Sequence, residues 1–124
     1  RAHRPSLASD TPLGFLSLLD VAFEFAHRLA PVLVALRRKD RSLEDQLRRA
    51  PASVVLNIAE GNGKSSLRDQ ARYFEIARGS CRESRAAMRL AAIWGYVDEV
   101  TVTELDALGD RVCALLSKLI SRAR

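Results

Sequence analysis

Arginine is the residue type with the most scope for chemistry in this 124-residue chain, and it accounts for 17 of the 20 Lys+Arg residues. Guanidinium groups form paired hydrogen bonds with carboxylates and phosphates. At 100° per residue, the spacing of 4, 3 and 4 places four arginines within about 60° of one another on a helix. They are Arg78, Arg82, Arg85 and Arg89. Glu75 is spaced to pair with Arg78, whereas the other three have no acid three or four positions away, so groups outside their own helix should neutralise them.

Three kinds of group can neutralise this stripe: acids of the following helix, phosphates of a nucleic acid, or acids of another subunit. The acids that follow in the sequence are Asp98, Glu99, Glu104, Asp106 and Asp110. A second basic cluster, Arg37 to Arg41 with Arg48 and Arg49, contains interleaved acids and is typical of a solvated helix end. The sequence leaves these alternatives open. The candidate nucleic-acid-binding residues are Arg82, Arg85, Arg89, Arg48, Arg49 and Lys64.

Motifs of catalysis and metal binding are incomplete. Glu24 and His27 have the Glu-x-x-His spacing of di-iron bundles, but such a site needs a second copy, and the only other histidine is His3. The run from Gly61 to Ser65 resembles the end of a phosphate-binding loop, but the required earlier glycine is replaced by Ile58. We therefore expect no enzymatic activity, cofactor, metal or small-molecule substrate.

The two cysteines, Cys81 and Cys113, have no partner at metal-ligand spacing and lie in apolar helical patterns, where a cysteine is most often a small core residue. They favour a reducing, cytoplasmic location without a disulfide framework. The start of the chain has no apolar run typical of a signal peptide, and no apolar stretch is long enough to cross a membrane.

Hydrophobic periodicity predicts helices over 12–38, 42–61, 66–94 and from residue 101 onward. The expected starts are Thr11 before Pro12, and capping boxes that begin at Ser42, Ser66 and Thr101. The inward stripe expected for the first helix is Leu16, Leu19, Phe23, Ala26, Ala30 and Leu33. Pro31 and Pro51 lie inside helices and should bend them.

Four amphipathic helices with short connections predict an all-α fold, an antiparallel up-down four-helix bundle over 12–124 with a flexible tail at 1–11. Residues 52–59 are apolar on more than one side of their helix. Because no helix of so small a bundle is central, we expect a homo-oligomer with an interface at Val55, Leu56 and Ala59.

Polar residues lie beside this apolar segment and need partners. Asn57 and Glu60 would each cost several kcal/mol if buried unpaired, so a structural role is expected, with Arg48 or Arg49 available to Glu60. Gly61 begins a turn that tolerates positive φ, and Gly79 permits a close helix approach.

Several segments together resemble a known family. They are Gln46-Leu47-Arg48-Arg49-Ala50, Ser53, Asn57-Ile58-Ala59-Glu60-Gly61, Ala77-Arg78-Gly79-Ser80 and Gly95-Tyr96. Over about residues 16 to 120 the chain resembles the four-helix bundle proteins encoded in intervening sequences of bacterial 23S ribosomal RNA genes. The resemblance implies a homopentamer. That family is similar to the accessory protein of diversity-generating retroelements, which works with a reverse transcriptase and RNA.

The net charge of +5 is distributed unevenly, at +3 over 1–41, +3 over 42–97 and −1 over 98–124. We expect a non-catalytic homo-oligomeric scaffold that binds RNA or DNA without sequence preference through its basic surface. The alternatives are a protein–protein interaction module that binds no nucleic acid, and an accessory subunit of a reverse transcriptase. Neither membrane nor small-molecule partners are expected.

Overall fold

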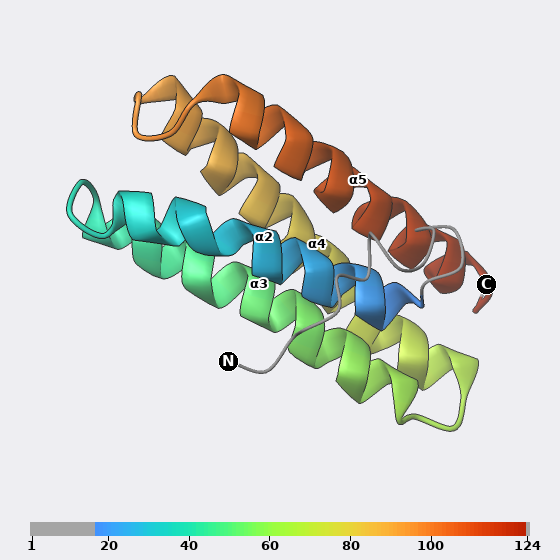
Figure 1. Ribbon diagram of the computed structural model, residues 1–124. Helices are drawn as coiled ribbons and strands as arrows, with labels where there is room; N and C mark the ends of the chain where they lie inside the picture. The colour runs from blue at the N-terminus through green and yellow to red at the C-terminus, as the bar shows by residue number, and fades with distance from the viewer. Residues whose placement is uncertain (1–16, 124) are drawn as a thin grey trace, which may run out of the picture.

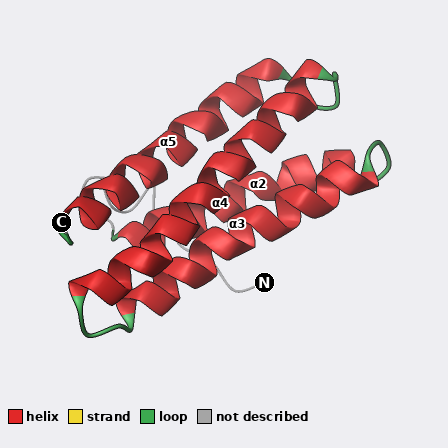
Figure 2. Ribbon diagram, turned by 180° about the vertical axis from the view of Figure 1, so that it is seen from behind, coloured by secondary structure: helices red, strands yellow, loops and turns green. Residues whose placement is uncertain are grey.

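Residues 17–123 form four helices in a computed structural model, and these described residues contain no strand (Figure 1). The helices are α2 (Leu18–Leu36), α3 (Arg41–Asn62), α4 (Leu67–Ile93) and α5 (Glu99–Ser121). Consecutive helices run in opposite directions and are joined by short turns, as the reverse view also shows (Figure 2). The predicted all-α bundle is therefore confirmed. The expected tail at 1–11 lies outside the described residues.

The helices pack in a ring in which α3 contacts α4, α4 contacts α5, and α2 contacts both α3 and α5. Each helix contributes an apolar stripe to one shared core. The largest fully buried side chains are Phe25, Leu29, Leu36, Leu47, Ile58, Met88, Leu116 and Ile120. Within the described residues, no helix is long and apolar enough to span a membrane.

The inward face of α2 differs from the predicted one. Val21, Ala22, Phe25, Leu29, Val32 and Leu36 are buried, whereas Phe23 of the predicted stripe is 47% exposed and Ala30 is also exposed. One residue corresponds to a 100° rotation about the helix axis. The predicted stripe lies at the edge of the core: Phe23 and Ala30 were placed wrongly, whereas Leu19 and Leu33 pack partly against the core. Leu16 lies outside the described residues. Periodicity did not separate the two stripes because α2 is apolar on both faces.

Helix starts depend on which polar side chain reaches a free amide. Ser66 caps α4 as predicted, by accepting a hydrogen bond from the Asp69 amide at 3.1 Å. By contrast, Asp40 and Asp98 cap α3 and α5, so the predicted starts at Ser42 and Thr101 were wrong.

The start of α2 also differs from the expected one. Ser17 caps this helix and forms a capping box with Asp20. The expected start at Thr11 lies outside the described residues. Pro31 and Pro51 are inside continuous helices.

Gly61 is required for close packing and not for a turn. It is buried in the last turn of α3, and a Cβ atom there would lie 2.6 Å from Cε1 of Phe74 on α4. Gly63 caps the helix with φ −83°, so the predicted positive-φ turn is absent from 61–63. Gly79 has open space around its Cβ position, so it does not mediate the expected close approach.

Substituting Gly61 by Ala should destabilise the protein by about 1 to 3 kcal/mol, because the added methyl group overpacks the contact with Phe74. Gly79→Ala is the matched control. It should stabilise the protein by up to about 1 kcal/mol, because alanine favours the helix and meets no neighbour. Urea unfolding followed by circular dichroism measures both. Equal effects of the two substitutions would contradict this account of Gly61.

Candidate nucleic-acid interface

Arg85 of α4 pairs with the acids of α5. Its Nε and Nη2 donate to the two carboxylate oxygens of Asp106 at 2.7 and 3.1 Å, and its Nη1 lies 3.5 Å from Asp110. This bidentate bond raises the pKa of Arg85 and lowers the pKa of Asp106. For Arg85, neutralisation by the following helix is therefore confirmed, and its guanidinium is already engaged.

Gly109 makes room for this arginine. A Cβ atom at residue 109 would lie 2.9 Å from Cγ of Arg85 and 3.2 Å from Cε1 of Phe25. The methylene stem of Arg85 thus occupies the space beside a buried glycine, while its charged end reaches Asp106. Sequence reasoning missed Gly109, because a glycine inside a helical pattern carries no sign of what will pack against it.

The arginine stripe predicted from spacing straddles the edge of the α4–α5 contact. Arg78 donates to Oγ of Ser117 on α5 at 3.0 Å, and Arg85 also faces α5. Arg82 and Arg89 lie on the solvent side and are exposed. Four residues within about 60° therefore divide between two environments, because a helix passes from buried to exposed within that arc.

Three of the arginines near the α2–α3 connection are engaged by local acids. Arg48 lies 3.3 Å from Asp45 and 4.0 Å from Glu44, and Arg49 lies 3.1 Å from Asp45. Arg37 is 3.8 Å from Glu44. These pairs offset much of the positive charge of the predicted cluster, even though its arginine side chains remain well exposed.

Lys64 is engaged in the α3–α4 connection. Its Nζ lies 3.3 Å from Glu60 and 5.1 Å from the ring centroid of Tyr73, over which Arg72 also lies. Within this chain Glu60 therefore pairs with Lys64, and not with Arg48 or Arg49.

A second set of arginines continues the solvent-facing stripe toward the start of α4. Arg68 and Arg72 are exposed and follow the same 4,3 spacing as Arg82 and Arg89, with Glu75, Gly79 and Ala86 between them. We call Arg68, Arg72, Arg82 and Arg89 the outer arginine face. Within residues 17–123, none of the four forms an ion pair. The signal was present in the sequence, but local acids at Asp69 and Glu75 obscured it.

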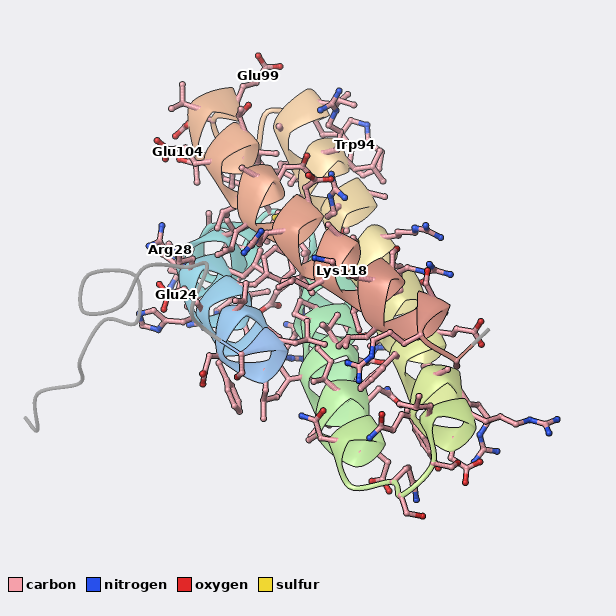
Figure 3. All side chains as sticks on the ribbon, turned by 90° about the vertical axis from the view of Figure 1, so that its right-hand side faces the viewer. Glu24, Arg28, Trp94, Glu99, Glu104 and Lys118 are labelled. Atoms are coloured by element: carbon pink, nitrogen blue, oxygen red, sulfur yellow. The ribbon has the colours of Figure 1, made fainter. Side chains whose placement is uncertain are left out.

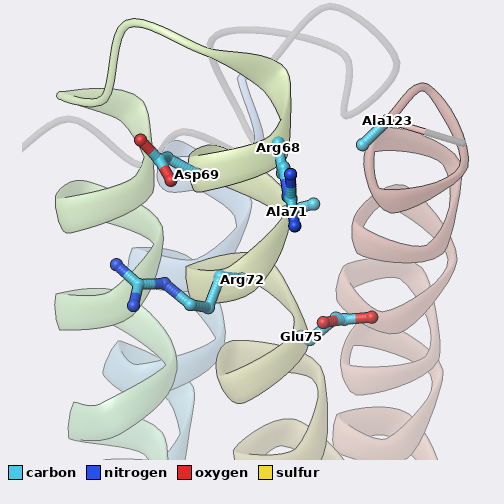
Figure 4. Close-up of a pocket in the computed structure, with 6 residues that line it drawn as sticks. All are labelled: Arg68, Asp69, Ala71, Arg72, Glu75 and Ala123. Atoms are coloured by element: carbon cyan, nitrogen blue, oxygen red, sulfur yellow. The ribbon is translucent and has the colours of Figure 1, made fainter.

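An open groove of about 650 Å³ lies between the start of α4 and the end of α5 (Figure 4). Its lining residues are Arg68, Asp69, Ala71, Arg72, Glu75 and Ala123. Arg68 and Glu75 lie on the side of α4 toward α5, and Asp69 and Arg72 lie toward α3. The groove is open, and both acidic and basic side chains line it, so it is not an enclosed anion pocket. Its two arginines are therefore considered as part of the exposed protein surface.

Three polar residues, Ser53, Asn57 and Ser80, form one hydrogen-bonded network between α3 and α4. Oγ of Ser53 lies 2.7 Å from Oγ of Ser80, and Asn57 donates to the carbonyl and hydroxyl oxygens of Ser53 at 2.9 and 3.1 Å. Asn57 therefore has the structural role expected of it.

The predicted oligomer interface is only partly covered by the bundle itself. Leu56 is 67% exposed and Ala59 is exposed, whereas Val55 packs partly against the core. Other large apolar side chains are also at least one-third exposed: Phe23, Val34, Leu67, Ile76, Leu90, Ile93, Trp94 and Val100. Only where such side chains form a contiguous patch do they mark an association surface.

Glu24 and His27 do not form a common site. Glu24 is buried and bonds Arg28 at 2.8 Å, and the two side chains lie side by side on α2, whereas His27 is exposed (Figure 3). Among residues 17–123, Oε1 of Glu24 has no hydrogen-bond partner. Residues 17–123 contain no cluster of three or more potential metal-binding His, Cys, Asp or Glu side chains.

Together these features define a class of protein: a small all-α bundle that presents an arginine-rich outer face on one helix. More specifically, the chain belongs to the 23S rRNA-intervening sequence protein family, whose sequence profile matches residues 16–118. The resemblance seen in the segments around Asn57 and Arg78 is thereby confirmed.

A solved structure shares this fold. It is the crystal structure of a protein of unknown function from the S23 ribosomal protein family of Bacteroides thetaiotaomicron, with a TM-score of 0.78 and 21% identity. The match covers 84% of this chain and 98% of that chain. At this identity the likeness establishes the fold alone. A search of curated proteins gives no match to this sequence.

The Arg85–Asp106 pair should make stability depend on acid pH. The folded-state pKa of Asp106 lies below its ordinary value of 3.8, so the stabilisation is present above that pH and is lost as the pH falls through the folded-state pKa. Asp106→Asn should cost about 1 kcal/mol at pH 7, a modest value because both side chains are partly solvated. It should also flatten the loss of stability below pH 4.

Urea unfolding at several pH values measures this dependence. Asp110→Asn is the control, since Asp110 lies farther from Arg85 and is 71% exposed, and it should change the profile less. If the loss of stability below pH 4 is the same in Asp106→Asn as in the wild type, the Arg85–Asp106 pair is not the source of that loss.

Proposed function

We propose that this chain is a non-catalytic homo-oligomeric scaffold that binds RNA or DNA without sequence preference through the outer arginine face of α4. The observation that carries the proposal is the exposure of Arg68, Arg72, Arg82 and Arg89 without ion pairs among the described residues. The proposal differs from the sequence prediction in its residues: Arg85, Arg48, Arg49 and Lys64 are already paired with acids.

The dimensions of the face suit a nucleic-acid backbone. From residue 68 to residue 89 a helix rises about 31 Å, close to the length of one turn of duplex. Gly79 and Ala86 carry little or no side chain between the arginines, so a phosphate chain can approach closely. Contacts of this kind position a backbone and read no base edges, which is why we propose binding without sequence preference.

Assembly would multiply a weak contact. One subunit carries a formal charge of +5, and a pentamer of the kind that the family resemblance implies would carry about +25 and five copies of the face. The exposed apolar side chain of Leu56, beside the apolar face of α3, supports an assembly through this helix. Scaffold and nucleic-acid binding are therefore parts of one proposal.

Binding should depend steeply on salt and on the outer arginines. With about four phosphate contacts per subunit, affinity for a duplex should fall roughly 100-fold between 50 and 200 mM salt. Arg82→Ala with Arg89→Ala should halve that salt slope. Fluorescence anisotropy with a labelled RNA or DNA duplex measures both quantities.

The matched control is Arg48→Ala with Arg49→Ala, which removes the same charge from arginines that are paired with Asp45. It should weaken binding much less. Equal losses for the two double variants, or no binding at low salt, would reject the outer arginine face as the binding surface. No binding together with an intact oligomer would support the alternative of a protein-interaction module.

Light scattering tests the assembly. The wild-type mass should be a multiple of 13.7 kDa, with five copies the expected number. Leu56→Asp should lower that mass, because a buried carboxylate in an apolar interface is costly, whereas Leu56→Met should keep it. A wild-type monomer at micromolar concentration would refute both the oligomer and the interface at Val55, Leu56 and Ala59.

A further inference from the structure

The two cysteines, which are far apart in sequence, meet at the contact between α4 and α5. Cys81 lies on α4 and Cys113 on α5; both are free thiols, and both are buried, Cys81 fully and Cys113 at 8% exposure. The sequence predicted that each is a small core residue, and both lie in the core. The structure in addition brings both residues to one contact, beside Arg85.

The geometry of this pair follows from the turn of α5 that begins at Gly109. The Cys81 thiol donates to the Gly109 carbonyl oxygen at 3.3 Å. In an α-helix the same carbonyl accepts the amide hydrogen of the residue four positions on, which is Cys113. The Cys81 sulfur therefore lies over the turn of α5 that carries Cys113.

The charges around the pair distinguish its two members. The neighbouring Cys81 thiol, and after it Arg85 and Arg82, lower the pKa of Cys113 to about 6, against the opposing effect of burial. The proximity of Cys113 and burial raise the pKa of Cys81, and the carboxylate of Asp106 contributes to this rise. These opposite shifts favour Cys113 as the thiolate of the pair and Cys81 as the thiol.

We propose that Cys81 and Cys113 form an intramolecular redox pair that a hydroperoxide converts into a disulfide between α4 and α5. The Cys113 thiolate attacks one peroxide oxygen, so that an S–O bond forms and the O–O bond breaks. Sulfur is oxidised to sulfenic acid while the other oxygen leaves as hydroxide and takes up a proton to become water. The Cys81 sulfur then attacks the Cys113 sulfur, its thiol proton joins the departing hydroxide, and a second water is released.

Hydrogen peroxide is the probe for this reaction. The purified, reduced full chain is treated at pH 7, denatured, alkylated and weighed intact. We expect a loss of about 2 Da, corresponding to two hydrogen atoms, no alkylation, and recovery of both thiols with dithiothreitol. Two alkylatable thiols after treatment, stable oxygen adducts in the wild type, or disulfides between chains would each overturn the proposal.

Variants assign the roles of the two sulfur atoms. Cys81→Ser should stop the reaction at a Cys113 sulfenic acid that dimedone traps, and Cys113→Ser should leave Cys81 reduced under the same exposure. Circular dichroism confirms that both variants are folded. If Cys113→Ser forms a sulfenic acid on Cys81 as fast as the wild-type protein reacts, Cys81 is the sulfur that attacks the peroxide. That result would overturn the mechanism.

Arg85 can be tested separately from folding. Arg85→Met keeps an apolar stem beside Gly109 and removes the guanidinium, so the pH midpoint of Cys113 ionisation should rise from about 6 toward the value of about 8.5 for a free thiol. Arg82→Met, which removes the more distant charge, should move it less. The ultraviolet absorbance of the thiolate measures the midpoint, and an unchanged midpoint in Arg85→Met would exclude Arg85 as its cause.

Discussion

The contact between α4 and α5 at Gly109 is the constraint on which the proposed binding surface depends. The methylene stem of Arg85 lies where a side chain at residue 109 would be, and its guanidinium is held by Asp106. A larger residue at 109 would displace this stem and the ring of Phe25. The position of Arg85, its ion pair with Asp106 and the packing of the neighbouring core therefore all depend on the absence of a side chain at residue 109. The same turn of α5 accepts the Cys81 thiol and carries Cys113, so the ion pair and the sulfur pair are parts of one contact.

This contact also determines which positive charges remain for a partner. Arg78 and Arg85 are engaged by α5, and Arg37, Arg48 and Arg49 are engaged by Glu44 and Asp45. The net charge of +5 is modest, but the outer arginine face presents four exposed arginines of α4 that form no ion pair with any other described residue. For electrostatic binding, the spacing of such charges matters more than their total, because each phosphate contact is local.

The α3–α4 hairpin combines an interior contact with an exposed one. Gly61 admits the ring of Phe74, and Ser53, Ser80 and Asn57 satisfy one another's polar groups at the same interface. Leu56, on the other side of α3, is left largely in solvent. The hairpin therefore has a complete internal interface and an outward apolar surface, which is the arrangement that a subunit of an assembly requires.

The sequence by itself determined the helices, the bundle and the family, because these depend on local periodicity, capping residues and a contiguous motif. It did not determine which stripe of α2 faces inward, since Phe23 and Phe25 both lie on apolar faces and only packing against the other helices selects one. Asp40 and Ser42 are both good caps, and the choice between them depends on the path of the preceding turn.

The division of the arginines, the role of Gly109 and the meeting of Cys81 with Cys113 were decided only by the tertiary structure. Each depends on the register between α4 and α5, which sets distances between residues that are far apart in the chain.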